Sequence, residues 1–357
     1  MKLWRVVAGV LALGFVAAGV TPAWACACGG YLPDADSQAR AYGENALVRY
    51  GGGTEQITLS MAINGSSKKA AWIMPVPAAA KVELGETGVF DRLNRMTRPK
   101  IVVRKTYWPF RDLGIMGSGR DSAGAPTAAG GGVNVREQMV LGPFQVARLE
   151  GTSGSAVTDW LSTNGYVVPA TLAENLTPYL SEDWEIVAVK LAPKQPGERM
   201  SGATPPLRLT FASDRIVYPM RLSKGATTQQ TVTVYVAAAH RVDATKLPDP
   251  DVTPELLYAG RVKDDADAVA IAGDPTVTAP AYFLTAYSAT YTDPSRITDD
   301  FTFERSATDD EYQRIEYVTR NDGFWSTLGV LFGGVLLLGV GAAVIARILA
   351  RRSATIV

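Results

Sequence analysis

A long apolar run near the C-terminus constrains this chain more than any other feature. Ser326–Ala346 comprises 21 residues without a single charge. A helix of that length spans about 31 Å, which matches the hydrocarbon thickness of a bilayer. Helices inside soluble cores rarely run so long without a charge. Together with the two aromatic residues before it, the run predicts a transmembrane helix at 324–346.

The residues on either side of the run indicate its orientation. Phe324 and Trp325 precede it, and Arg347, Arg351 and Arg352 follow it. Aromatic side chains favour the membrane interface, and arginines close to a span stay on the cytoplasmic side. We therefore expect a single pass through the cell membrane, with the N-terminal part extracytoplasmic and residues 347–357 as a cytoplasmic tail. The lipid bilayer is thus an expected partner.

Two glycines define one face of the predicted span. Gly329 and Gly333 form a G-x-x-x-G spacing. Small residues at this spacing let two helix backbones approach closely, which would allow a homodimer. Glycine is also common in transmembrane helices that do not pair, so both interpretations stay open.

The N-terminus has the features of a secretory signal peptide at residues 1–25. Lys2 and Arg5 supply the positive charge, Val6–Val20 the apolar core, and Ala23–Ala25 a cleavage site of small residues around Trp24. We expect the mature chain to begin at Cys26. An uncleaved anchor is the alternative, although the apolar core is short for a span.

The chain has two cysteines, Cys26 and Cys28. An exported location permits a disulfide between them. Their Cα atoms would lie about 7 Å apart in extended backbone, so the backbone must bend, which the following glycines allow. Lipidation of Cys26, intermolecular pairing and metal binding are the alternatives. No cofactor is expected, because no further cysteine and no histidine cluster completes a metal site.

The exported part is acidic. Five of the 35 basic residues lie in the signal or the tail, which leaves 30 against 35 acidic residues and a net charge of about −5. This balance argues against a nucleic-acid partner. Cys26–Asp322 is long enough for one large domain or two ordinary ones.

Alternating apolar residues predict a β-rich exported part, residues 26–323. In Gln56–Ile63 the alternation predicts a strand with Ile57, Leu59, Met61 and Ile63 on one face. Asn64-Gly65 is typical of a turn, so Lys69–Val76 is expected to return as the second strand of a hairpin, with Pro75 and Pro77 ending the pairing. Further strands are predicted at Ile101–Trp108, within Val133–Arg148, and at Trp184–Leu191, Leu207–Phe211, Ile216–Leu222, Thr231–Ala238, Tyr282–Tyr291 and Asp300–Arg305.

Helices are expected to be few and short. One follows a Thr87 cap and ends before Pro99, a second carries Trp160, and a third covers Thr171–Leu180. Residues 114–132 predict a flexible Gly/Ala-rich loop, Pro193–Pro206 another loop, and 306–323 a polar stalk. The predicted fold class is α+β: a β-rich ectodomain with several antiparallel sheets and a few short helices, plus one C-terminal transmembrane helix.

No segment has the pattern of a catalytic site. The single histidine, His240, follows a strand, and no G-x-S-x-G motif accompanies it. The acidic groups Asp264-Asp265 with Asp267, Asp299-Asp300, and Asp309–Glu311 lack the spacing of a calcium loop, so solvated loop charge is the expected role. The aromatic and proline segments Trp72–Pro77 and Tyr107–Phe110 are typical of core or edge strands, with an exposed binding platform as the alternative.

Several segments resemble a known bacterial family. They are Cys26–Gly30, Ala71–Pro77, Asn164–Tyr166, Leu176–Leu180, Pro206–Phe211 and Val217–Leu222. As a set they resemble the bacterial domain-of-unknown-function 2330 family, over about residues 26–245. The resemblance implies an exported bacterial protein and no particular chemistry.

The leading hypothesis is a single-pass cell-surface protein whose ectodomain binds an envelope component or a protein partner. An envelope enzyme that works with carboxylates is the first alternative. A structural protein that self-associates through Gly329 and Gly333 is the second.

Overall fold

The computed structural model describes residues 29–33, 40–67, 69–106, 135–141, 144–149, 153–191, 200–273 and 282–353. These residues form two compact units. The body takes its residues from 1–98 and 122–313, and the C-terminal unit takes its residues from 99–121 and 314–357. Cys26 and Cys28, the predicted signal peptide and the predicted loop at 114–132 lie outside the described residues.

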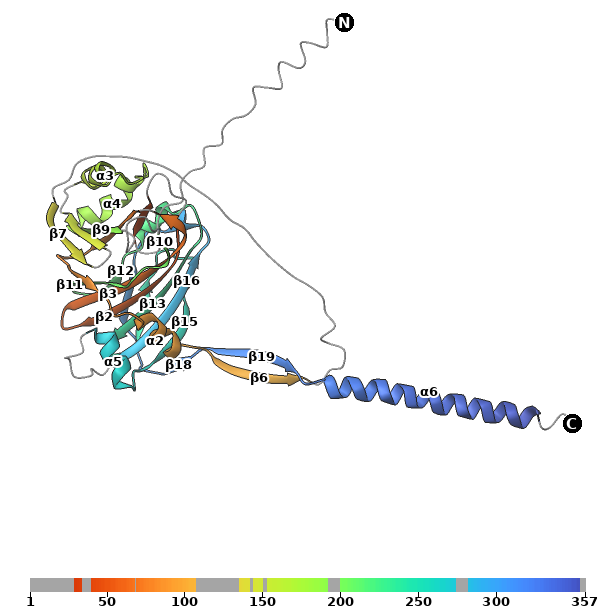
Figure 1. Ribbon diagram of the computed structural model, residues 1–357. Coiled ribbons are helices and arrows are strands. Elements are labelled where there is room, and N and C mark those ends of the chain that lie inside the picture. Colours follow the sequence, from red (N-terminus) through yellow and green to blue (C-terminus); the bar gives the residue numbers. More distant parts are fainter. Residues whose placement is uncertain are drawn as a thin grey trace, which may run out of the picture. The chain divides into compact units, whose positions relative to one another are not determined.

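A nine-stranded sheet dominates the body (Figure 1). Its strands follow the order β18-β15-β16-β13-β2-β3-β11-β5, and β10 also pairs with β3. The bounds are β2 (Arg40–Gly51), β3 (Thr54–Ser67), β5 (Lys81–Leu84), β10 (Met200–Ala203), β11 (Leu207–Ala212), β13 (Gln230–Ala238), β15 (Glu255–Arg261), β16 (Phe283–Tyr291) and β18 (Tyr312–Gln313). The neighbours are antiparallel except β2 and β13, which run parallel.

Two smaller sheets complete the β structure of the body. The five-stranded sheet has the order β1-β4-β9-β8-β7, and the three-stranded sheet has the order β12-β17-β14. Their bounds are β1 (Gly30–Pro33), β4 (Ala70–Val76), β7 (Val135–Leu141), β8 (Phe144–Leu149), β9 (Glu185–Leu191), β12 (Ile216–Tyr218), β14 (Val242–Lys246) and β17 (Phe301–Arg305). The helices are α2 (Val89–Met96), α3 (Gly154–Thr163), α4 (Leu172–Ser181) and α5 (Asp265–Ala272), with 3-10 turns η1 (Arg221–Gly225) and η2 (Pro294–Arg296).

The strand alternation arranges these elements in layers. On β13, Val234 faces the core shared with the five-stranded sheet, whereas Tyr235 faces α2 and α5. On β4, Trp72 lies in that same shared core, and Ile73 packs under α3 and α4. The two larger sheets are therefore covered by helices on their outer faces and by each other on their inner faces. The predicted β-rich α+β fold class is confirmed.

Two predictions about strand pairing are wrong. β3 continues through Asn64-Gly65, and its hairpin partner is β2. The tight turn falls instead at Gly52-Gly53, whose φ angles of 60° and 72° suit a two-residue hairpin turn. β4 pairs with β1 and β9 and not with β3, and it continues through Pro75. β1 pairs with Ala70–Ile73 of β4, so Pro75 lies beyond that pairing and is matched with Ile186 of β9, and proline is tolerated where a strand lacks a neighbour on one side.

Smaller differences concern caps and loops. Gly88 caps α2 where Thr87 was expected, and Ser153 caps α3 by accepting a hydrogen bond from the N–H of Ala156. β10 lies inside the predicted Pro193–Pro206 loop. The predicted core face of β3 is confirmed, because its four apolar residues Ile57, Leu59, Met61 and Ile63 are at most 4% exposed.

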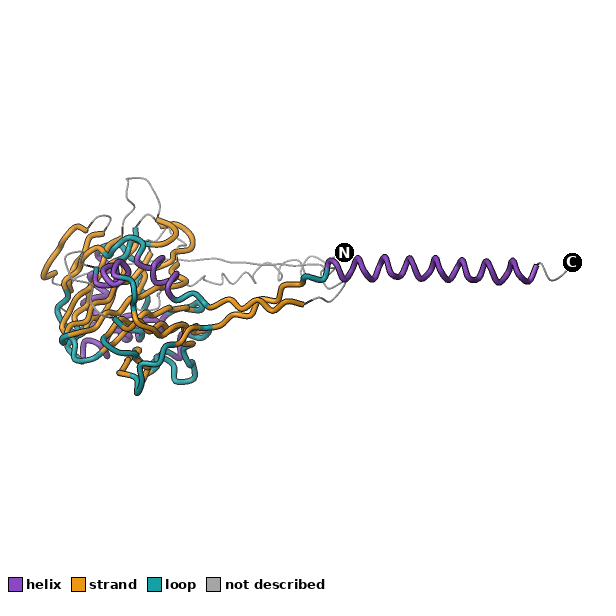
Figure 2. Tube along the Cα trace, turned by 90° about the horizontal axis from the view of Figure 1, so that it is seen from below, coloured by secondary structure: helices purple, strands orange, loops and turns teal. Residues whose placement is uncertain are grey.

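The C-terminal unit contains a ribbon and a long helix, and Figure 2 shows both as continuous tubes. The ribbon consists of β6 (Lys100–Thr106) and β19 (Ile315–Asn321), which run parallel in a two-stranded sheet. Helix α6 (Phe324–Ser353) follows β19 after two residues. Within α6, Trp325–Arg351 is long and apolar enough to cross a membrane, and none of its most apolar window is buried.

Candidate functional site

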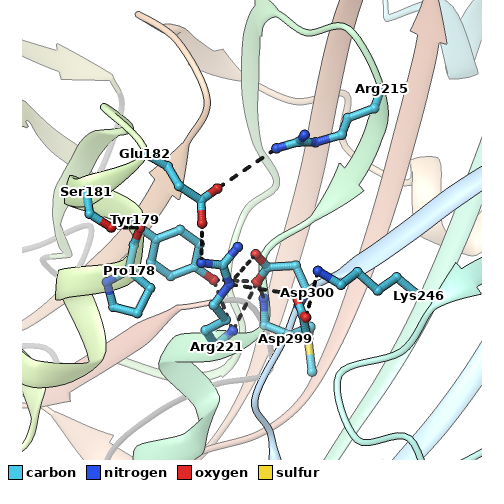
Figure 3. A network of polar contacts seen from close by, with 10 residues as sticks. Pro178, Tyr179, Ser181, Glu182, Arg215, Arg221, Lys246, Asp299 and Asp300 are labelled. Atoms are coloured by element: carbon cyan, nitrogen blue, oxygen red, sulfur yellow. Dashed lines mark hydrogen bonds and ion pairs between the residues drawn. The ribbon is translucent and has the colours of Figure 1, made fainter.

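A cluster of polar side chains in the body joins α4, η1 and the start of β17 (Figure 3). The hydroxyl of Tyr179 donates to Oδ1 of Asp300 at 2.5 Å, and the same oxygen accepts the backbone N–H of Met220 at 2.7 Å. Nε of Arg221 lies 2.8 Å from Oδ2 of Asp300. Tyr179 and Asp300 are almost fully buried. One oxygen of this buried carboxylate thus accepts hydrogen bonds from a hydroxyl and a backbone N–H, and the other forms an ion pair with a guanidinium.

Charged residues nearer the surface surround this cluster. Glu182 binds Arg221 at 2.6 Å and lies 4.0 Å from Arg215. Asp299 binds Lys246 at 2.7 Å (Figure 3). The network therefore links α4, η1, β14 and the start of β17. The prediction of solvated loop charge is wrong for Asp300, which is 2% exposed. Asp299 is more exposed, and its partner Lys246 has a side chain that is 58% exposed.

The electrostatics of the cluster favour a structural role. Burial raises the pKa of the Tyr179 hydroxyl well above its usual value, and the negative charge of Asp300 raises it further. The hydroxyl therefore stays protonated at neutral pH and acts as a donor. Burial works against the charge of Arg221, but its hydrogen bond with Glu182 and the charge of Asp300 raise the pKa of the guanidinium overall. Burial also raises the pKa of Asp300, although the charge of Arg221 opposes this. The arrangement fixes α4 against the sheet.

Two further buried carboxylates lie in the nine-stranded sheet. Glu44 accepts a hydrogen bond from the Tyr218 hydroxyl. Glu55 is fully buried, and its Oε2 accepts the backbone N–H of Val217 at 3.0 Å. Burial raises the pKa of Glu55 well above its usual value, although the Val217 N–H opposes this. Glu55 is thus a group whose protonation is coupled to folding.

A pocket of about 530 Å³ lies on the other side of the body, beside α2, α5 and the edge of the nine-stranded sheet. Such a volume suits a small ligand. Its lining combines apolar and charged residues: Leu84, Gly85, Glu86, Arg92, Arg208, Asp265, Ala266, Val269, Ala270 and Gly273. The lining thus brings together two arginines and two carboxylates.

Arg208 is the most enclosed charge in the pocket lining, with a side chain 15% exposed. Its Nη1 donates to the Gly273 carbonyl at 2.5 Å, and its Nη2 lies 3.4 Å from Glu83. Its Nε is buried without a hydrogen-bond partner among the described residues. Gly273 has a φ of 67° at the end of α5, and a Cβ there would lie 2.2 Å from Nη1. Only glycine leaves room for this contact.

Arg92 is more accessible than Arg208. It is 37% exposed, and its two acidic neighbours are loosely paired: Asp267 at 3.5 Å and Glu86 at 3.9 Å. Long ion pairs on a partly exposed side chain exchange readily for a better partner. Arg92 can therefore bind an anionic group that enters the pocket, while Glu86 and Asp265 can accept from a cationic one.

The histidine and the acidic groups form local ion pairs. His240 is 40% exposed, and its Nδ1 lies 2.9 Å from Asp309. The hydrogen bond with His240 lowers the pKa of Asp309, with help from the Arg241 N–H. Asp264 caps α5 through the N–H of Asp267. Among the described residues, no group of three or more His, Cys, Asp or Glu side chains could hold a metal ion.

The aromatic and proline segment at Trp72–Pro77 is core. Trp72, Met74 and Val76 are 0% exposed, which excludes an exposed platform there. Tyr107–Phe110 lies outside the described residues. Asp300, Arg221 and Arg208 were missed as site residues. The available signal was that Tyr179, Arg208 and Arg221 all lie in segments that carry the family resemblance.

The predicted anchor residues lie on α6. Trp325 is 77% exposed at the first turn, and Arg347 and Arg351 lie in the C-terminal part of the helix. Gly329 and Gly333 have no heavy atom within 4 Å of the position a Cβ would take, so the helix presents an open small-residue face there.

The architecture and the apolar helix define a β-rich α+β protein with one C-terminal segment able to cross a membrane. The profile of the family described as "Uncharacterized protein conserved in bacteria (DUF2330)" matches residues 22–304. The chain belongs to this family. A search of curated proteins finds no match. Among solved structures, the crystal structure of baculovirus P35 matches with 10% identity and a TM-score of 0.32, covering 78% of this chain and 98% of that chain. This similarity is too weak to assign a fold or a function.

Proposed function

We propose that this protein is a single-pass, membrane-anchored binding protein that holds a polar component of the cell envelope in the pocket beside α2 and α5. The pocket carries the proposal, because it combines a volume suited to a small ligand with charges of both signs. The ligand class that fits is zwitterionic, such as a short peptide, with its carboxylate at Arg92 and its ammonium at Glu86 or Asp265.

The apolar helix supports a location at the cell membrane. We propose that α6 spans the cell membrane with the body extracytoplasmic and the arginine-rich end cytoplasmic. The N-terminal signal features support export of the body. An envelope ligand or a partner at the cell surface would then be directly accessible to the pocket.

Thermal unfolding of the purified protein with a series of dipeptides tests the binding function. A ligand that binds only the native state raises Tm, and at 100 times Kd the stabilisation reaches about 2.7 kcal/mol. Arg92→Gln and Asp265→Asn should abolish the shift while leaving the unliganded Tm unchanged. Arg95→Gln is the matched control, because Arg95 is exposed on the same helix and does not line the pocket. A shift that survives both pocket variants would contradict the proposal.

The pocket also supports a second candidate, an envelope hydrolase. Two carboxylates, Glu86 and Asp265, line one cavity, which is the minimum that acid and base catalysis needs. Mass spectrometry of a bound peptide after long incubation separates the two functions. A binding protein returns the peptide intact, whereas a hydrolase returns fragments, and Asp265→Asn should then stop the cleavage.

A further inference from the structure

The ribbon formed by β6 and β19 is an unusual sheet. Parallel strands are normally covered on both faces, and a two-stranded sheet is marginally stable without a partner surface. Within the part of the chain that the structure describes, no third strand joins this sheet. Five of its six large apolar side chains are 43% to 53% exposed, namely Ile101, Val103, Ile315, Tyr317 and Val318. The ribbon therefore offers uncovered surface to a partner.

The register divides the ribbon into two faces that differ in charge. Paired residues point to the same side, and the pairs include Lys100 with Ile315, Val102 with Tyr317 and Arg104 with Thr319. We call this side the Tyr317 face; its residues are Lys100, Val102, Arg104, Thr106, Ile315, Tyr317 and Thr319. It has two cations and no acidic residue. On the opposite face, Glu316 is present, and Lys105 and Arg320 are both paired with Asp322, at 3.2 Å and 2.8 Å.

The Tyr317 face combines cations with apolar surface. The guanidinium of Arg104 lies 3.7 Å from the centre of the Tyr317 ring, a cation–π contact that holds the two side chains together. Ile315 and Lys100 lie opposite each other farther along the same face. Tyrosine, aliphatic and long basic side chains in one patch suit the interfacial region of a membrane, where rings and stems contact lipid and charges contact phosphate.

The ribbon is joined directly to the apolar helix. Only Asp322 and Gly323 separate β19 from α6, and the N–H of Asp322 continues the ladder by donating to Thr106 at 2.9 Å. Seven residues of strand extend about 23 Å, so the whole ribbon stays within that distance of the helix. The surface nearest to it is the headgroup layer of whichever membrane α6 enters.

We propose that the Tyr317 face binds the anionic phospholipid headgroups of that membrane. The proposal rests on the anchoring part of the proposed function. Charge complementarity favours this partner, because anionic lipid attracts basic segments next to a span. A second copy of the chain fits less well, since a two-fold contact would bring Lys100 and Arg104 against their own copies. The face, roughly 23 Å by 10 Å, is also far smaller than the surface a stable dimer buries.

Hydrogen exchange of the full chain in nanodiscs tests this proposal. One set of discs contains phosphatidylcholine alone, and the other contains a third phosphatidylglycerol. We expect the β6 and β19 amides to exchange about tenfold more slowly in the anionic discs, and high salt to remove the difference. Lys100→Glu should also remove the difference in exchange between the two kinds of disc. Arg95→Glu, a charge reversal at an exposed position of α2 in the body, should not. Arg104→Lys keeps the charge and loses the planar stacking, so it should retain most of the protection.

Each contrary result has a distinct meaning. Unprotected α6 amides would overturn the anchoring and the ribbon proposal together. Protected α6 amides with equal ribbon exchange in both kinds of disc would overturn the ribbon proposal alone. Ribbon protection that depends on two chains per disc, and not on lipid charge, would also overturn it and assign the face to self-association.

Discussion

The hydroxyl of Tyr179 on α4 lies 2.5 Å from the buried carboxylate of Asp300 at the start of β17, although the two residues are 121 positions apart in the chain. Asp300 also binds Arg221 and the N–H of Met220. One carboxylate thus joins a helix, a 3-10 turn and a strand. Loss of this group should loosen all three contacts together.

Asp300→Ala should destabilise the protein by about 3–5 kcal/mol, because it removes the shared buried acceptor of Tyr179 and Met220 and leaves the largely enclosed Arg221 with Glu182, a more exposed partner, as its main ion pair. Tyr179→Phe should cost about 1–3 kcal/mol, the usual effect of removing one partner of a buried hydrogen bond. Asp251→Ala is the control, since Asp251 lies outside this network, its side chain is 76% exposed, and the loss of its ion pair with Arg296 should cost below about 1 kcal/mol. Chemical denaturation measures all three. Equal costs for Asp251 and Asp300 would contradict the interpretation that Asp300 joins the three elements.

Glu55 should make stability decrease as pH rises. Its native pKa is raised by burial, so above about pH 4.5 the unfolded chain releases a proton that the native protein keeps. The stability contributed by Glu55 is complete below its unfolded pKa and is lost progressively until the pH reaches the native pKa. Glu55→Gln should remove this dependence, by up to about 1.4 kcal/mol per pH unit over that interval.

Glu83 on β5, at the edge of the same sheet, provides a control of opposite sign. The hydrogen bond with Lys81 lowers the pKa of Glu83. Its contribution is therefore present above the unfolded pKa and is lost as the pH falls through the native one. Glu83→Gln should weaken the protein most at neutral pH. Thermal melts between pH 4 and pH 8 compare the two variants, and a Glu55→Gln profile parallel to wild type would contradict the first prediction.

Gly273→Ala should destabilise the protein and displace Arg208. The substitution strains a backbone with φ of 67° and places a Cβ 2.2 Å from Nη1 of Arg208. Gly88→Ala separates the two effects, because Gly88 has φ of 88° and open space around it. We expect Gly273→Ala to cost at least about 1 kcal/mol more than Gly88→Ala. If the two costs are equal, the Arg208 contact adds nothing.

Gly329→Ile with Gly333→Ile should abolish self-association of the chain in membranes if α6 pairs through its small-residue face. Neither position has a neighbour within 4 Å, so the change leaves the rest of the monomer untouched. Gly334→Ile with Gly341→Ile is the control, because these positions point about 100° away around the helix. Energy transfer between labelled chains in vesicles measures the association. Association that persists in the first double variant would exclude this face.

Intact mass of the membrane-extracted protein should show a chain that begins at Cys26. A Cys26–Cys28 disulfide would make it lighter than the reduced chain by a pair of hydrogens. A retained Met1 would contradict signal cleavage. A lipid adduct on Cys26 would replace the disulfide with a second attachment to the membrane.

Local elements were predictable because their signals are local. The alternation in β3 is visible in the sequence, and the helical spacing of Val89 and Leu93 marks α2. The pairing of β4 was not predictable, because its seven residues are buried on both faces and carry no alternation that indicates a partner. The burial of Asp300 was equally unpredictable, because the adjacent Asp299 is the same residue type but is more exposed. Burial depends on packing between distant segments, which a single sequence does not specify.

The parallel pairing of β2 with β13 also determines the order in which the body can assemble. Val234 pairs with Ala46 at the middle of the nine-stranded sheet. The hairpin of β2 and β3 therefore cannot pair with β13 until most of the chain has left the ribosome. Such distant contacts slow folding, because loop closure precedes any gain from pairing. The outermost strand, β18, ends at Gln313, just before the ribbon and α6. The last strand of the body and the apolar helix are therefore synthesised almost together, and a chain truncated before α6 would end shortly after the final strand of the body.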